Sequence, residues 1–185
     1  MTISRAHAAF LESIKDAENL LGIFDELNAK PPPPKLEVLK RAGLVMAMTA
    51  WETYVEDRLQ EAAAEKLAGV ADSIVGRFVL SRLAEDIKRL HNPSSDKTIQ
   101  LFVDYAGVDV SDGWLWSGLE PKNVKTRLDS YLKLRGDVVH RSRVAVKGPP
   151  PPDPVTRETL QKAVTFLKEL VKVTDKALEP AKATT

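Results

Sequence analysis

Arginine and histidine stand five positions apart in the segment KLRGDVVHRSR (residues 133–143), as Arg135 and His140. Arginine is a permanent cation that binds anions through a rigid fork of N–H donors, and histidine exchanges a proton near neutral pH. Three readings of the segment stay open at this point. It is a surface Arg-Gly-Asp adhesion tripeptide, a solvated helix end, or the working part of an enzyme.

The helical pattern around Arg135 makes the arginine unusual. On an ideal helix, at ~100° per residue, Arg135 falls near the middle of an apolar face. That face contains Val124, Leu128, Tyr131, Val138 and Val139. Burial of an unpaired guanidinium costs several kcal/mol, because arginine cannot lose its proton. Arg135 is therefore paired or opens onto a cleft or a partner, unless it reaches solvent from the edge of the bundle.

Helical signals dominate the rest of the chain, and alternating strand patterns are scarce. Ser4 predicts the cap of a first helix that runs to about Asn28, and Pro121 suits the first turn of the helix that carries Arg135. The remaining predicted helices cover about 36–67, 73–90 and 95–106, together with a last apolar helix that contains Leu160 and Leu178. We predict an all-α fold, an antiparallel bundle of about four major helices with a small helical and loop insertion.

Two proline-rich runs, 31–34 and 149–154, divide the predicted helices. Such runs bind SH3-type domains or act as stiff connectors, and the connector reading is favoured between helices. A chain of 185 residues suits one domain. We therefore predict a single domain over 1–185, with a core at about 5–178.

The composition is that of a soluble globular protein, with 43% hydrophobic and 29% charged residues. Cysteine is absent, which excludes disulfides, thiolate catalysis and cysteine-bound zinc. The first residues do not resemble a signal peptide, and the most apolar run is too short to cross a bilayer, so we expect a cytoplasmic protein. The net charge is only +1, but the segment 122–147 has eight basic and two acidic residues.

Several segments, in order along the chain, resemble the HEPN superfamily of all-helical nucleases. Arg135 and His140 match its R-x(4–6)-H motif, and VKTRLDSYLKLRGDVVHR (124–141) resembles the helix that carries it. MAMTAWETYVEDRLQE (46–61) looks like the family's second-helix signature, and TIQLFVDYAGVDVSDGW (98–114) is similar to the segment before the motif helix. Over about 5–178 the chain resembles the RiboL-PSP-HEPN branch.

This resemblance implies a metal-independent endoribonuclease that acts as a homodimer with both motifs in one cleft. His140 would act as general base or acid, and Arg135 would stabilise charge in the transition state, while the 2′-OH of RNA is the nucleophile. Lys133, Arg141 and Arg143 are candidates for contact with the RNA backbone. The implied setting is a toxin, phage-defence or RNA-processing system, with RNA and an antitoxin or defence protein as partners.

The motif departs from the family pattern in one place that bears on activity. Gly136 follows the motif arginine, where relatives often have a polar residue, so either the activity is reduced or an orienting role moves to Asp137. An ideal helix separates Arg135 from His140 by ~140° and ~7.5 Å. Either the helix loosens at Gly136, or Arg135 of one chain works with His140 of its partner.

The remaining candidate residues have less specific patterns. Glu52 is a supporting residue if it pairs with Arg135; the alternative is a helix-surface acid that pairs with Arg58 or Lys40. Trp51 is expected in the core or at a dimer interface. His7 and His91 have no metal-like spacing to other ligands, so we expect both at the surface and predict neither a metal nor a cofactor.

Two further functions compete with the nuclease. One is a catalytically silent HEPN module that binds RNA, a nucleotide or a partner protein, which the glycine after Arg135 and the modest charge favour. The other is a helical scaffold with a coincidental motif, which full exposure of an unpaired Arg135 would support. Cell adhesion requires an exposed extracellular loop, so we set it aside.

Overall fold

The computed structural model describes residues 3–29, 33–140 and 153–179. Within these ranges the chain forms six α-helices and two short 3-10 helices, with one isolated β-bridge between Trp116 and Leu119 and no strand. The all-α prediction is confirmed. The α-helices are α1 (Arg5–Leu27), α2 (Glu37–Leu67), α3 (Ile74–Lys88), α4 (Ser95–Ala106), α5 (Pro121–His140) and α6 (Arg157–Ala177).

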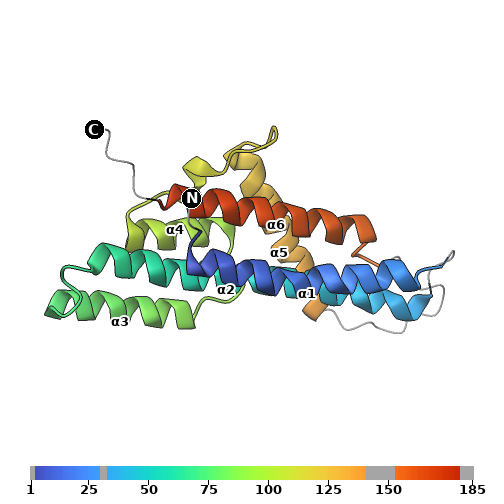
Figure 1. Ribbon diagram of the computed structural model, residues 1–185, viewed down its shortest axis with the longest axis horizontal. Helices are drawn as coiled ribbons and strands as arrows, with labels where there is room; N and C mark the ends of the chain where they lie inside the picture. The colour runs from blue at the N-terminus through green and yellow to red at the C-terminus, as the bar shows by residue number, and fades with distance from the viewer. Residues whose placement is uncertain (1–2, 30–32, 141–152, 180–185) are drawn as a thin grey trace.

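The two N-terminal helices form the long base of the bundle. α1 begins where the Ser4 hydroxyl accepts a hydrogen bond from the His7 backbone N–H, as the sequence predicts. α1 and α2 lie side by side and antiparallel (Figure 1). Their contact buries aromatic side chains completely, with Phe10 of α1 edge-on to Tyr54 of α2. Trp51, also on α2, lies fully buried in this core.

Helices α3 and α4 pack on α2 and are joined by the turn at residues 89–94. α3 runs back along α2 (Figure 1), and the Ser73 hydroxyl caps its start. The helix predicted at 73–90 ends two residues early, at Lys88. α4 has the predicted bounds, and it ends at Gly107, whose φ of 69° is the left-handed conformation that glycine adopts most easily.

The last two helices close the bundle. α5 crosses behind α6 at a steep angle (Figure 1) and contacts α2 and α4. α6, capped by Thr156, covers α1 and α2 with a buried row that includes Leu160, Leu167 and Leu170. The loop before α5 also joins the core, because the Trp114 indole N–H donates to the Thr174 hydroxyl of α6 at 2.9 Å.

Much of the proline-rich connectors lies outside the described residues, at 31–32 and 149–152. Of the first run, Pro34 opens a 3-10 helix, η1 (Pro34–Leu36), which leads directly into α2. A second 3-10 helix, η2 (Val110–Gly113), follows α4. Over the described ranges, no helix is both long enough and apolar enough to cross a membrane.

Candidate functional site

Arg135 is held by two other elements near the C-terminal end of α5. Its Nη1 donates to the Asn92 side-chain oxygen at 3.3 Å, and its Nη2 lies 3.7 Å from a carboxylate oxygen of Glu52 on α2. The other Glu52 oxygen accepts the Asn92 backbone N–H at 2.9 Å. The Arg135 side chain is 22% exposed, so it is both partly buried and paired. This excludes the exposed, unpaired arginine expected of a coincidental motif.

The competing partners of Glu52 are engaged elsewhere. Lys40 pairs with Glu37 one turn before it on the same helix, at 2.7 Å. The Arg58 Nε donates to Asp175 of α6 at 3.0 Å. Glu52 therefore faces α5 and the turn at 89–94, while its neighbour Trp51 points into the core.

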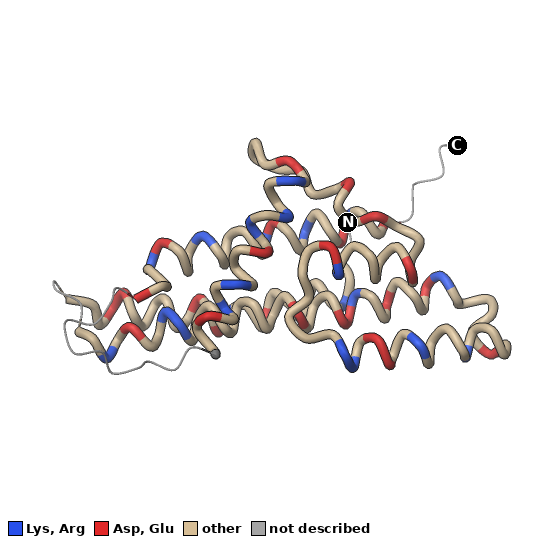
Figure 2. Tube along the Cα trace, turned by 180° about the vertical axis from the view of Figure 1, so that it is seen from behind, with Lys and Arg blue, Asp and Glu red and all other residues tan. Residues whose placement is uncertain are grey.

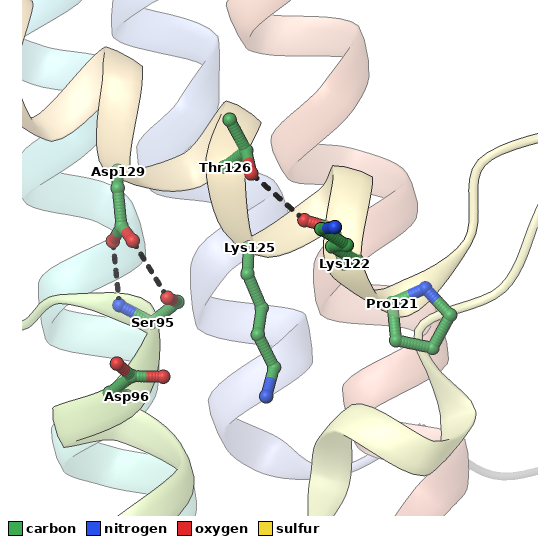
Figure 3. A pocket seen from close by; sticks show the side chains of 7 residues that line it. All are labelled: Ser95, Asp96, Pro121, Lys122, Lys125, Thr126 and Asp129. Carbon is green, nitrogen blue, oxygen red and sulfur yellow. Dashed lines mark hydrogen bonds between the residues drawn. The ribbon is translucent and has the colours of Figure 1, made fainter.

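A second contact fixes α5 against the start of α4. The Asp129 carboxylate accepts both the backbone N–H and the hydroxyl of Ser95, each at 2.8 Å. Figure 3 shows this double hydrogen bond beside an open pocket of about 360 Å³, whose lining includes Asp96, Lys122 and Lys125. Asp129 lies six residues before Arg135 on α5, and Ser95 directly follows the 89–94 turn. The contact therefore fixes the position of this turn relative to α5.

The motif helix does not loosen at the glycine. α5 is α-helical without a break from Pro121 through Gly136 to His140. A regular helix leaves positions 135 and 140 ~140° apart around the axis. The sequence left open a helix that loosens at Gly136. Within one chain this prediction is wrong, because the helix is regular there. The other arrangement, in which Arg135 of one chain works with His140 of its partner, stays a prediction.

The apolar face predicted for α5 is correct except at its end. Val124, Leu128 and Tyr131 are buried, and Val138 is partly buried. Val139 is 52% exposed, so its place on the buried face is wrong. The helix leaves the core over its last turn, where fewer neighbouring side chains cover it.

Basic residues recur along the described part of α5, and Figure 2 marks their positions in blue. Lys133 is exposed and Asp137 is partly buried. The structure describes His140 only as the last residue of the helix, and Arg141 and Arg143 lie outside the described residues. Their proposed roles stay predictions.

Glu56 lies one helical turn after Glu52 and extends the acidic face of α2. Burial raises the pKa of Glu56, and the nearby Glu52 and Asp57 carboxylates raise it further, while His91 opposes them. The His91 side chain is exposed, as expected. A carboxyl with a raised pKa, one helical turn from Glu52, is a feature that the sequence did not reveal.

His7 is not at the surface, which corrects the prediction. It is 7% exposed, and its Nδ1 lies 3.3 Å from a carboxylate oxygen of Asp175. The same carboxylate accepts the Ser4 hydroxyl at 2.6 Å and the Arg58 Nε. Because the Ser4 hydroxyl donates to Asp175 and not to His7, the cluster is not a serine nucleophile with its base. It ties the start of α1 to α2 and α6.

A metal ion requires a group of coordinating side chains that lie close together. Among residues 3–29, 33–140 and 153–179, no three His, Asp or Glu side chains gather as a metal site would require.

A family model described as RiboL-PSP-HEPN matches residues 11–180, which includes every helix from α2 to α6 and most of α1. No curated protein and no solved structure matched the chain. The chain belongs to the RiboL-PSP-HEPN family.

Proposed function

We propose that this protein is a metal-independent endoribonuclease. The observation that supports this most is the partly buried Arg135 guanidinium, held by Glu52 and Asn92 five residues before His140 on α5. An arginine fixed in this way is organised before the substrate arrives, which is how enzymes stabilise charge in a transition state. The Arg135 Nε is also buried without a hydrogen-bond partner among the described residues. A bound phosphate and a small shift of the side chain would supply one.

In the proposed reaction the RNA supplies its own nucleophile. The imidazole of His140 takes the proton from a 2′-OH, and the 2′ oxygen forms a bond to the adjacent phosphorus. The bond from phosphorus to the 5′ oxygen breaks, and that oxygen takes a proton from solvent water and leaves as a hydroxyl. The products carry a 2′,3′-cyclic phosphate and a 5′-OH. Arg135 stabilises the added negative charge on the phosphoryl oxygens.

We further propose that the site is composite, built from two copies of the chain. The unbroken α5 directs positions 135 and 140 of one chain to different sides of the helix. A symmetric dimer brings Arg135 of one copy to His140 of the other and forms two equal sites. Lys133, with Arg141 and Arg143, would contact the RNA backbone, and Asp137 would orient the groups of the motif.

Mixed dimers test this arrangement directly. When R135A and H140A chains are mixed and exchanged, half of the dimers contain one chain of each. In a composite site such a dimer has one intact site, so about a quarter of the wild-type activity returns. A site within one chain regains none.

The second candidate is a HEPN module that binds RNA or a partner without cleaving it. It is favoured by the glycine after Arg135 and by the two contacts that already occupy the guanidinium. We place either function in a toxin, phage-defence or RNA-processing system of the cytoplasm, with an antitoxin or defence protein as a further partner.

The deciding experiment incubates purified protein with total RNA and tRNA in EDTA, beside R135A, H140A and the control R127A. Arg127 is an exposed base on the same helix, so its removal matches the change in charge without touching the site. Cleavage by wild type and R127A, with a loss of at least a hundredfold in the other two, supports the nuclease. Intact RNA with wild type, together with a measurable RNA affinity, supports the silent module.

A further inference from the structure

Asn92 occupies a strained position in the turn between α3 and α4. Its φ is 55°, in the left-handed region that asparagine tolerates better than most residues. Leu90 and Pro93 on either side are buried, and the Ser94 hydroxyl caps α4. The turn is therefore anchored at both ends, and the backbone at Asn92 is held in one conformation.

The left-handed conformation lets Asn92 contact two elements at once. Its backbone N–H donates to Glu52 on α2 at 2.9 Å, and its side-chain oxygen accepts from Arg135 on α5 at 3.3 Å. Since a guanidinium has only donors, the oxygen and not the nitrogen of the amide must face it. Glu52 and Arg135 lie 3.7 Å apart, which closes a ring of three residues from three elements.

We propose that Asn92 is a positioning residue that fixes the Arg135 guanidinium, directly through its side-chain oxygen and indirectly by holding Glu52. The consequence for catalysis rests on the proposed nuclease function, but the positioning itself can be measured without RNA. Glycine at this position would keep the left-handed backbone and the N–H, and would lose only the acceptor. This makes the role of the side chain separable from that of the turn.

An arginine side chain has several rotatable bonds, and ordering it costs rotamer entropy. When Asn92 and Glu52 order it beforehand, that cost is not added to the barrier of the reaction. Displacement of a positioned group by about 1 Å lowers the rate by roughly a hundredfold. Loss of the Asn92 oxygen should therefore lower kcat by at least about tenfold, and KM should change by less than about threefold.

Three variants separate positioning from folding. N92G removes the acceptor and keeps the backbone conformation, and N92D keeps an acceptor in the same place. S117G is the matched control, because Ser117 is also left-handed, with φ of 45°, but lies in the exposed loop before α5. Each variant is first compared with wild type by circular dichroism and thermal unfolding.

The first readout is the ¹⁵N NMR signal of the Arg135 guanidinium, assigned by its absence in R135K. We expect restricted rotation in wild type, N92D and S117G, and fast rotation in N92G. The second readout is kcat and KM for a cleaved RNA, where N92D should retain more kcat than N92G. Equal Arg135 signals in N92G and wild type overturn the proposal, whether or not the protein cleaves RNA. If wild type cleaves no RNA, the nuclease function fails, and the NMR comparison alone decides the positioning role.

Discussion

Replacement of Glu52 tests the site as a structural unit. Its carboxylate accepts the Asn92 backbone N–H at 2.9 Å and lies 3.7 Å from the Arg135 guanidinium. The side chain is only 17% exposed, so water replaces these contacts poorly once it is removed. E52A loses both contacts, whereas E52Q keeps an oxygen that accepts from Asn92 and loses the charge.

The two contacts differ in strength. A hydrogen bond from a backbone N–H to a carboxylate contributes about 1.5–3 kcal/mol. A partly exposed ion pair at this distance adds at most about 1 kcal/mol. Relief of the repulsion between Glu52 and Glu56 offsets part of the loss. We therefore expect E52A to lower the free energy of unfolding by about 2–3 kcal/mol and E52Q by about 1 kcal/mol.

The assay is urea unfolding followed by circular dichroism, with R135A and the double variant E52A/R135A completing a double-mutant cycle. A coupling energy of about 1 kcal/mol between positions 52 and 135 is expected. Equal stabilities of E52A and E52Q would refute the role of the Asn92 hydrogen bond. A coupling energy of zero would refute the ion pair.

Three further predictions concern other parts of the fold. D175A should lower the free energy of unfolding, measured in urea, by about 3–5 kcal/mol. The reason is that the buried Arg58, 4% exposed, loses the carboxylate to which it donates. A loss below about 1 kcal/mol contradicts this. G136A should raise stability by about 1 kcal/mol, since Gly136 is helical and an added Cβ meets no atom within 4 Å. A lower melting temperature argues against it. E56Q should raise the melting temperature at pH 7, because the raised pKa of Glu56 means that its ionised form destabilises the folded state. That difference should disappear below the ordinary pKa of 4.5, where the carboxyl is protonated in both states, and a difference that persists there points to another cause.

The helices could be predicted because their signals are local. Ser4 caps α1 through an N–H three residues away, and Pro121 begins α5 at the predicted residue. The Asn92-Pro93 pair, a sequence typical of turns, likewise separates α3 from α4. Each of these signals lies within one helical turn of the boundary that it sets.

The contacts between distant residues could not be predicted in this way. His7 pairs with Asp175, which lies 168 positions away, and nothing near His7 in the sequence indicates burial. Asn92 was visible only as a turn residue, because its partners Glu52 and Arg135 are 40 and 43 positions distant. An arginine on an apolar face left three outcomes open: a paired side chain, one that opens onto a cleft or a partner, and one that reaches solvent. Only the packing of the structure shows that Glu52 and Asn92 are the partners of Arg135.

End-group analysis of RNA cleaved in EDTA tests the central proposal most directly. Wild-type protein should produce fragments with 2′,3′-cyclic phosphate and 5′-OH ends, and neither R135A nor H140A, each folded and with the wild-type oligomeric state, should produce them. Cleavage that leaves 5′-phosphate ends, or that survives in both variants, would contradict the mechanism built on Arg135 and His140.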